Sequence, residues 1–201
     1  MQTDLIHKTS ITLLITFNLF VNNASFASEN TSAAITAEQN ELRLLLQTAI
    51  KDSKSFKDRF DAEVWLVDMS NRLKKKIPHP EKRLKLLRQI HVEASRAELH
   101  PELVLAVIDV ESNFDRFAIS KAGAQGLMQV MPFWLKEIGR PEDNLFHLRT
   151  NLRMGCTILR YYLDMEKGDL TQALARYNGS KGSYRYTNKV FKVLNERWRK
   201  Y

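Results

Sequence analysis

The chain has 201 residues, with 31 Lys and Arg against 23 Asp and Glu, a formal net charge of +8. This length suffices for one compact domain with a short extension but hardly for two independent domains. The charge predicts a surface that attracts polyanions, without choosing among nucleic acid, anionic lipid and cell wall. Seven Gly and five Pro are few for this length. Together with apolar residues that recur at spacings of three and four, they predict an all-α fold.

Residues 1–27 have the form of an export signal. A basic start precedes the apolar stretch 11–21, and Ser25 and Ala27 supply the small residues that a cleavage point after Ala27 requires. The apolar stretch is too short to span a bilayer comfortably, which leaves an uncleaved anchor as the alternative. We therefore expect a periplasmic or secreted protein with no stable membrane insertion after cleavage, a location that removes nucleic acid as a partner.

The remaining residues are predicted to be helical, with 28–80 as an N-terminal helical extension and 81–201 as the main domain. The 112–125 segment is predicted to be a loop, because it contains Ser, Gly and Asn. Apolar periodicity, capping residues and prolines predict helices, in chain order, over 36–50, 57–77, from Pro80 onward, from Pro101 to about Glu111, and near 127–138, 151–166, 171–178 and 186–199.

Glu111 is anomalous because it ends the most apolar helix of the chain. Residues 103–108 are apolar on every side of that helix, which predicts a place at the centre of the core. Helical geometry puts Glu111 beside this apolar surface, where desolvation raises the pKa of a carboxyl and lets it keep a proton near neutral pH. The alternative is a structural carboxylate paired with a Lys or Arg. Asp109 lies about 200° away around the helix and is interpreted as structural.

No cofactor or metal is expected. His91-Val92-Glu93 has the His-x-Glu form of zinc deaminases, but the paired cysteines of such sites are absent. Cys156 is the only cysteine, so it cannot form an internal disulfide. Its apolar neighbours predict that it is a small buried residue.

Three motifs in order carry a resemblance to a known family. They are Glu111-Ser112, the run Gly-Ala-Gln-Gly-Leu-Met-Gln-Val-Met-Pro at 123–132, and Ala-Leu-Ala-Arg-Tyr-Asn-Gly at 173–179. The ordered set resembles the lytic transglycosylase domain of the soluble type, which shares its fold with goose-type lysozyme. The match runs over about 99–182. It implies that residues 81–201 form a lysozyme-like helical catalytic domain.

The resemblance also implies roles for the first two motifs. The Glu of the Glu-Ser pair is the catalytic acid and base in this family, a role that falls on Glu111. Ser112 helps to hold that carboxyl, or else bonds only backbone. Gln129 and Met131 match positions that line the glycan cleft, with an amide for a sugar hydrogen bond and an apolar surface for a sugar ring. For Met128 and Met131, filling of the core is the alternative.

The third motif and a serine complete the implied site. Tyr177 and Asn178 match a Tyr-Asn pair that faces the catalytic Glu and helps to place the acetamido group of a sugar. A purely structural contact of the Tyr177 hydroxyl is the alternative. Ser120 matches a cleft serine of some relatives. The stretch 178–182, Asn-Gly-Ser-Lys-Gly, departs from the usual Asn-Ala-Gly and puts a polar, basic loop beside the cleft.

The implied activity is cleavage of peptidoglycan glycan strands between N-acetylmuramic acid and N-acetylglucosamine, with Glu111 as acid and then base and a 1,6-anhydromuramyl end as product. Two-carboxylate glycosidases need a second Asp or Glu, whereas a substrate acetamido group can replace it. Asp115 is the nearest candidate in sequence, and the family does not use it. Two alternatives stay open: a lysozyme-like hydrolase of peptidoglycan, and a catalytically silent wall-binding or assembly scaffold.

Overall fold

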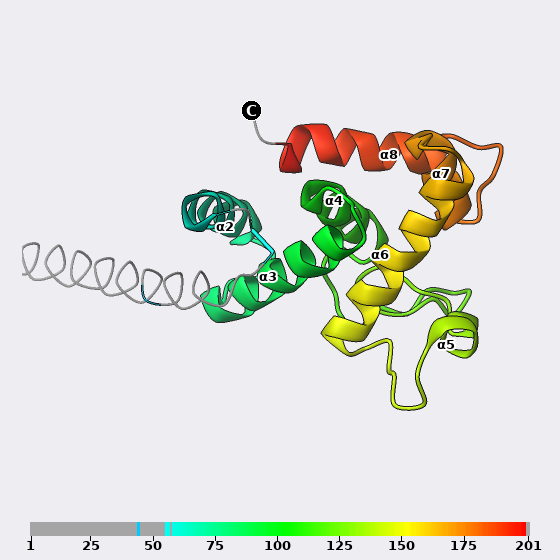
Figure 1. Cartoon of the computed structure of the whole chain (residues 1–201), viewed down its shortest axis with the longest axis horizontal. Coiled ribbons are helices and arrows are strands. Elements are labelled where there is room, and N and C mark those ends of the chain that lie inside the picture. The colour runs from blue at the N-terminus through cyan, green and yellow to red at the C-terminus, as the bar shows by residue number, and fades with distance from the viewer. Residues whose placement is uncertain (1–43, 45–54, 57, 200–201) are drawn as a thin grey trace, which may run out of the picture. The chain divides into compact units, whose positions relative to one another are not determined.

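A computed structural model describes residues 44, 55–56 and 58–199 of the chain. In this part it is helical, and its only β-type pairings are two isolated bridges, Ile119 with Gln125 and Gln125 with Val130. The all-α prediction is therefore confirmed here. The helices are α2 (Arg59–Leu73), α3 (Pro80–Arg96), α4 (Pro101–Glu111), α5 (Phe133–Ile138), α6 (Leu148–Met165), α7 (Leu170–Tyr177), α8 (Arg185–Val193) and the π-helix η1 (Leu194–Trp198) (Figure 1).

Helix α4 lies at the centre of the core, as its apolar sequence predicts. Its residues 103–108 are all at most 5% exposed. Helices α3, α8 and η1 pack against it, and α3 also contacts α2 and α6 (Figure 1). Pro101 begins the helix, a position where its missing N–H costs no hydrogen bond. Since α4 is fixed on several sides, its last residue, Glu111, is carried by a rigid element.

Helix α2 ends four residues earlier than predicted, at Leu73 rather than Ile77. The following turn brings the carbonyls of Ile77 and Pro78 to the buried guanidinium of Arg83, at 2.8 and 2.6 Å. Arg83 also donates to Ser70 Oγ at 3.1 Å. Because a buried guanidinium requires acceptors, these contacts favour the turn over another helical turn.

The helix predicted near 127–138 is also shorter, and only Phe133–Ile138 is helical. Gln125 and Val130 instead exchange two backbone hydrogen bonds of 2.9 and 3.0 Å, which close a tight loop. Within this loop Gln129 has a φ of +49°, a left-handed conformation that an α-helix cannot contain. The remaining helices start within three residues of their predicted positions. The segment predicted as an α-helix over 186–199 ends in the π-helix η1, because Arg199 N donates to Leu194 O five residues back.

The predicted export signal and the helix predicted over 36–50 lie outside the described residues, apart from Leu44, which is helical. The chain divides into two compact units, Met1–Leu44 and Leu45–Tyr201, and the helices named above all belong to the second. Among the helices that the structure describes, none combines the length and the apolar composition needed to cross a membrane.

Candidate active site

Glu111 is the last residue of α4 and is only partly exposed. Desolvation by burial raises the pKa of its carboxyl, as the sequence predicts. Three neighbours act in the opposite direction: hydrogen bonding by Tyr186 and Asn178, and the positive charge of Lys189. No ion pair of Glu111 is found within the described part of the protein. Burial is thus the largest influence on the pKa of this carboxyl, and the Lys189 charge acts on it without an ion pair in this part of the protein.

Tyr186 is a neighbour of Glu111 that the sequence analysis missed. It lies on α8 and is buried, and burial together with the charge of Glu111 raises its pKa well above the usual value. Its hydroxyl makes no hydrogen bond of ordinary geometry to any described residue, although it is close enough to act on the pKa of Glu111. The two side chains are therefore neighbours rather than a bonded pair. A buried Tyr hydroxyl normally finds a partner, which makes this one available to the carboxyl or to a ligand.

Ser112 bonds backbone only. Its hydroxyl lies 2.8 Å from Leu127 O and 3.2 Å from Ile108 O, the second being the carbonyl of the preceding helical turn. Since a hydroxyl donates one hydrogen bond at a time, the shorter contact links the end of α4 to the loop at 127. The backbone role is thus the one present, and the predicted hydrogen bond to the Glu111 carboxyl is not found.

Met128 is a correction to the predicted cleft. Its side chain is 0% exposed and cannot present a surface to a glycan, so the core-filling alternative is correct. It packs where α6 carries Gly155, and a Cβ at that glycine would stand 2.5 Å from the Met128 sulfur. Cys156, buried as predicted, lies 4.0 Å from the same sulfur, and burial raises the pKa of its thiol. A small residue at 155 is therefore required for the loop to dock on α6.

Gln129 and Met131 are partly exposed on the same loop. The amide nitrogen of Gln129 donates to the carbonyls of Ala118 and Gly126, at 3.1 and 2.9 Å. Its amide hydrogens therefore fix the loop, and its carbonyl oxygen is the atom left to contact a sugar. Contact of Met131 with a sugar ring stays a prediction.

Tyr177 and Asn178 end helix α7 beside Glu111. The Tyr177 hydroxyl donates to Met128 O at 2.7 Å, which is the structural contact named as the alternative. Burial raises its pKa, and the charge of Glu111 is the second cause, so the ring lies near the carboxyl as expected. Asn178 is partly exposed and lies close enough to Glu111 to lower the pKa of its carboxyl. The pair thus serves two purposes, with Tyr177 supporting the loop and Asn178 facing the acid.

Ser120 belongs to a small turn. Its hydroxyl accepts a hydrogen bond from Ala124 N at 3.0 Å, and its own N–H donates to Ala124 O at 2.9 Å. These contacts give Ser120 a local structural role. A contact between Ser120 and a glycan stays a prediction.

Asn151 is a second residue that the sequence analysis missed. It is buried on α6, where its Oδ1 accepts from Met128 N at 2.8 Å and its Nδ2 donates to Gln125 O and Leu145 O, each at 2.9 Å. Each of its polar atoms thus bonds the backbone of the loop or of the segment before α6. The available signal was an Asn at the start of the helix predicted near 151–166, because a buried amide must be hydrogen-bonded.

No group of three or more His, Cys, Asp or Glu in the described residues could hold a metal ion. His91, considered above as part of a His-x-Glu pair, stacks on Phe56 with ring centroids 3.5 Å apart. Burial lowers its pKa to about 4. Its ring is thus part of an aromatic contact between the segment before α2 and helix α3.

Comparisons with known proteins agree with the motifs. The family described as the transglycosylase SLT domain matches residues 88–197. A transglycosylase of Enterobacteria phage PRD1 is 33% identical over 113 residues, which cover 53% of this chain and 42% of the phage protein. The membrane-bound lytic murein transglycosylase C of Yersinia pestis (strain Pestoides F) is 32% identical over 122 residues, covering 52% of this chain and 34% of that protein.

Among solved structures, the 70 kDa soluble lytic transglycosylase of Escherichia coli is similar with a TM-score of 0.44 and 20% identity. The similarity covers 77% of this chain and 30% of that one. The present protein spans less than half the length of the two curated relatives named above. Because the family match takes in more than half of its residues, the chain belongs to the transglycosylase SLT domain family.

Proposed function

We propose that this protein is a peptidoglycan lytic transglycosylase in which Glu111 is the general acid and then the general base. The proposal rests on the surroundings of the Glu111 carboxyl. It ends the most buried helix, its pKa is raised by burial, and Asn178 and Tyr186 stand next to it. A carboxyl in such surroundings can deliver a proton near neutral pH. Family membership supports the same chemistry.

The proposed reaction balances without water. Glu111 gives its proton to the oxygen between N-acetylmuramic acid and N-acetylglucosamine, and the bond from the muramyl C1 to that oxygen breaks. The Glu111 carboxylate then takes the proton of the muramyl 6-hydroxyl, whose oxygen bonds C1 and closes a 1,6-anhydro ring. One residue acts first as acid and then as base, which leaves Glu111 protonated at the end of the cycle.

The other carboxylates near Glu111 in sequence are poor candidates for a second catalytic group. The Asp109 side chain is 2% exposed and paired with Lys76 and Arg197. Asp115 is exposed, and its Oδ1 accepts from Phe117 N at 2.9 Å. We propose that the acetamido oxygen of the substrate stabilises the oxocarbenium-like centre instead, the route that a single acid requires.

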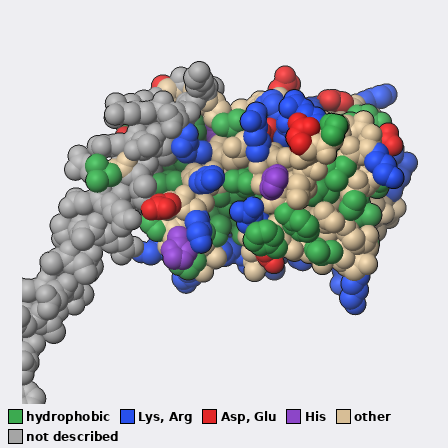
Figure 2. All heavy atoms as spheres, turned by 90° about the horizontal axis from the view of Figure 1, so that it is seen from below, with side chains coloured by type: hydrophobic (Ala, Val, Ile, Leu, Met, Phe, Trp, Pro, Cys, Tyr) green, Lys and Arg blue, Asp and Glu red, His purple; other side chains and the backbone are tan. Residues whose placement is uncertain are grey.

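The proposed substrate is the glycan strand of peptidoglycan, and the proposed location is the periplasm or the outside of the cell. The location rests on the predicted export signal and on the cell-wall substrate. The basic balance of the protein suits an anionic polymer. Figure 2 shows Lys and Arg side chains distributed over one face of the molecule, between apolar side chains.

Mass spectrometry of the products from purified sacculi tests the proposed activity. The expected product carries a 1,6-anhydromuramyl end, which is lighter than a reducing end by one water. Products with reducing ends would instead support the lysozyme-like hydrolase. Binding to sacculi with no released product would support the silent scaffold. Either result overturns the proposal.

A further inference from the structure

Two consecutive non-glycine residues with positive φ follow directly after Glu111-Ser112. Asn113 has a φ of 52° and Phe114 a φ of 68°. Asn adopts this left-handed conformation with little strain, whereas a bulky residue such as Phe stays there only when its surroundings hold it. The turn that leads away from the proposed acid is therefore maintained by contacts from elsewhere in the fold.

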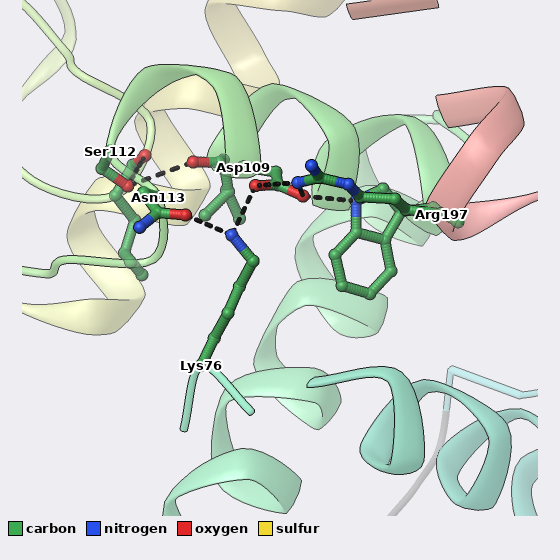
Figure 3. A network of polar contacts seen from close by, with 8 residues as sticks. Lys76, Asp109, Ser112, Asn113 and Arg197 are labelled. Atoms are coloured by element: carbon green, nitrogen blue, oxygen red, sulfur yellow. Dashed lines mark hydrogen bonds and ion pairs between the residues drawn. The ribbon is translucent and has the colours of Figure 1, made fainter. Parts of the chain in front are cut away.

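Those contacts converge on a group that we call the Asp109 cluster, composed of Lys76, Asp109, Asn113, Arg197 and Trp198. Figure 3 labels the first four of these residues. The Lys76 ammonium bonds both Asn113 Oδ1 and Asp109 Oδ1, the latter at 2.8 Å. On the other side, Asp109 Oδ2 accepts from Arg197 and from Trp198 Nε1, each at 3.1 Å. One buried carboxylate thus joins the turn after α2, helix α4 and the π-helix η1.

The strained residue, Phe114, is held by the same groups. Its ring lies 5.6 Å from that of Trp198, and the Lys76 ammonium is 5.6 Å from the Phe114 centroid. Arg72, one turn before Lys76, donates to Arg197 O at 2.8 Å. The end of α2 is thereby fixed to the segment that follows α8, and Lys76 bridges from there to the turn after Glu111.

We propose that Lys76 is a positioning residue for Glu111. It holds the left-handed turn at Asn113 and Phe114, and this turn fixes the direction in which the end of α4 presents the Glu111 carboxyl. The inference rests on the proposed function of Glu111. Lys76 lies outside residues 88–197, the part matched by the family. Lys76 thus supports Glu111 from the segment before the matched domain. No residue of that segment is assigned to catalysis.

The test compares Lys76→Met with Lys75→Met in the full-length protein. Lys75 is the adjacent lysine and is exposed, so it is a matched control. We expect Lys76→Met to lower kcat about tenfold or more while KM stays within about threefold, since a displaced catalytic group costs turnover rather than binding. Lys76→Arg should recover much of the loss because it keeps the charge. Lys75→Met should match the wild type.

Asn113→Gly separates positioning from stability. Glycine adopts a positive φ without strain but removes the oxygen that Lys76 binds. We expect the melting temperature of this variant to be maintained while kcat falls. A merely structural Lys76 predicts the opposite pattern, with lower melting temperatures and wild-type kcat at 25 °C for both variants. That pattern would overturn the inference.

Titration of the Glu111 carboxyl by ¹³C NMR gives a readout that needs no turnover. Lys76→Met should shift the Glu111 midpoint relative to Lys75→Met, which removes an equal charge, because a displaced carboxyl has a different degree of burial and burial is the largest cause of its raised pKa. If the wild type releases no product, the proposed function fails, and the titration still decides whether Lys76 positions Glu111. An unchanged midpoint in Lys76→Met overturns the inference. An active wild type with an unchanged kcat in Lys76→Met also overturns it, and then the proposed function stands.

Discussion

Asp109 and Glu111 stand two residues apart near the end of α4, on nearly opposite sides of the helix, and their surroundings differ. Asp109 is buried against Lys76, Arg197 and the indole N–H of Trp198. Glu111 is partly exposed, has no ion-pair partner among the described residues, and faces Tyr186 and Asn178. The Asp109 carboxylate is thus paired with two cations, whereas the Glu111 carboxyl is partly buried and has no such pair. Burial gives a carboxyl a proton to deliver only where no cation pairs with it.

The largest effect is expected from Glu111→Gln. Glutamine keeps the size of the side chain but can neither donate nor accept the transferred proton, so turnover should fall by about 10² to 10⁴-fold. The melting temperature and the binding to sacculi should change little. Release of soluble muropeptides measures turnover, and circular dichroism checks the fold. Near wild-type release by a folded Glu111→Gln protein would return Glu111 to the structural alternative.

Asp109→Asn should show the complementary pattern, with its main effect on stability. Asn has one acceptor oxygen where the carboxylate has two, so the donors Lys76, Arg197 and Trp198 lose part of their hydrogen bonding, and we expect the free energy of unfolding to fall by about 2 kcal/mol. Denaturant unfolding measures this change. Asp164→Asn is the control, because that carboxylate pairs with Arg160 on the exposed side of α6 and should contribute no more than about 0.5 kcal/mol. Equal losses for the two variants would contradict the assigned role of Asp109.

The two tyrosines near Glu111 should differ in the same way, one affecting stability and the other turnover, but with smaller effects. Tyr177→Phe leaves Met128 O without its donor, so the free energy of unfolding should fall by about 1 to 2 kcal/mol. Tyr186→Phe removes a hydroxyl that has no ordinary hydrogen bond, and stability should be unchanged or higher. Turnover should nevertheless fall about tenfold, because this hydroxyl can donate to the carboxylate that forms during the reaction. The reverse pattern would exchange the roles given to the two residues.

The sequence predicted those parts of the site that depend on one helix. The apolar run 103–108 and the prolines that begin α3 and α4 give these helices their positions, and helical geometry alone separates Asp109 from Glu111. Desolvation of Glu111 follows from the same local pattern, which is why the direction of its pKa shift could be predicted.

The missed features depend on contacts between segments distant in sequence. Gln129 is left-handed in a loop whose Met128 N–H is bonded by Asn151, more than twenty residues later, and helix periodicity carries no sign of that contact. Tyr186 lies 75 positions after Glu111 and reaches it only through the packing of α8 on α4. Met128 matched a cleft motif, yet the absence of a side chain at Gly155 lets it enter the core.

Direct titration of the Glu111 carboxyl tests whether Glu111 is the acid that the enzyme uses. In ¹³C NMR of the full-length protein, the Glu111 midpoint should lie above its ordinary value of 4.5, because desolvation outweighs the neighbouring donors and Lys189. Since the protonated form is the active acid, kcat/KM should fall as pH rises through that same midpoint. A midpoint at or below the ordinary value, or a value of kcat/KM that does not fall through this midpoint, would show that Glu111 is not that acid.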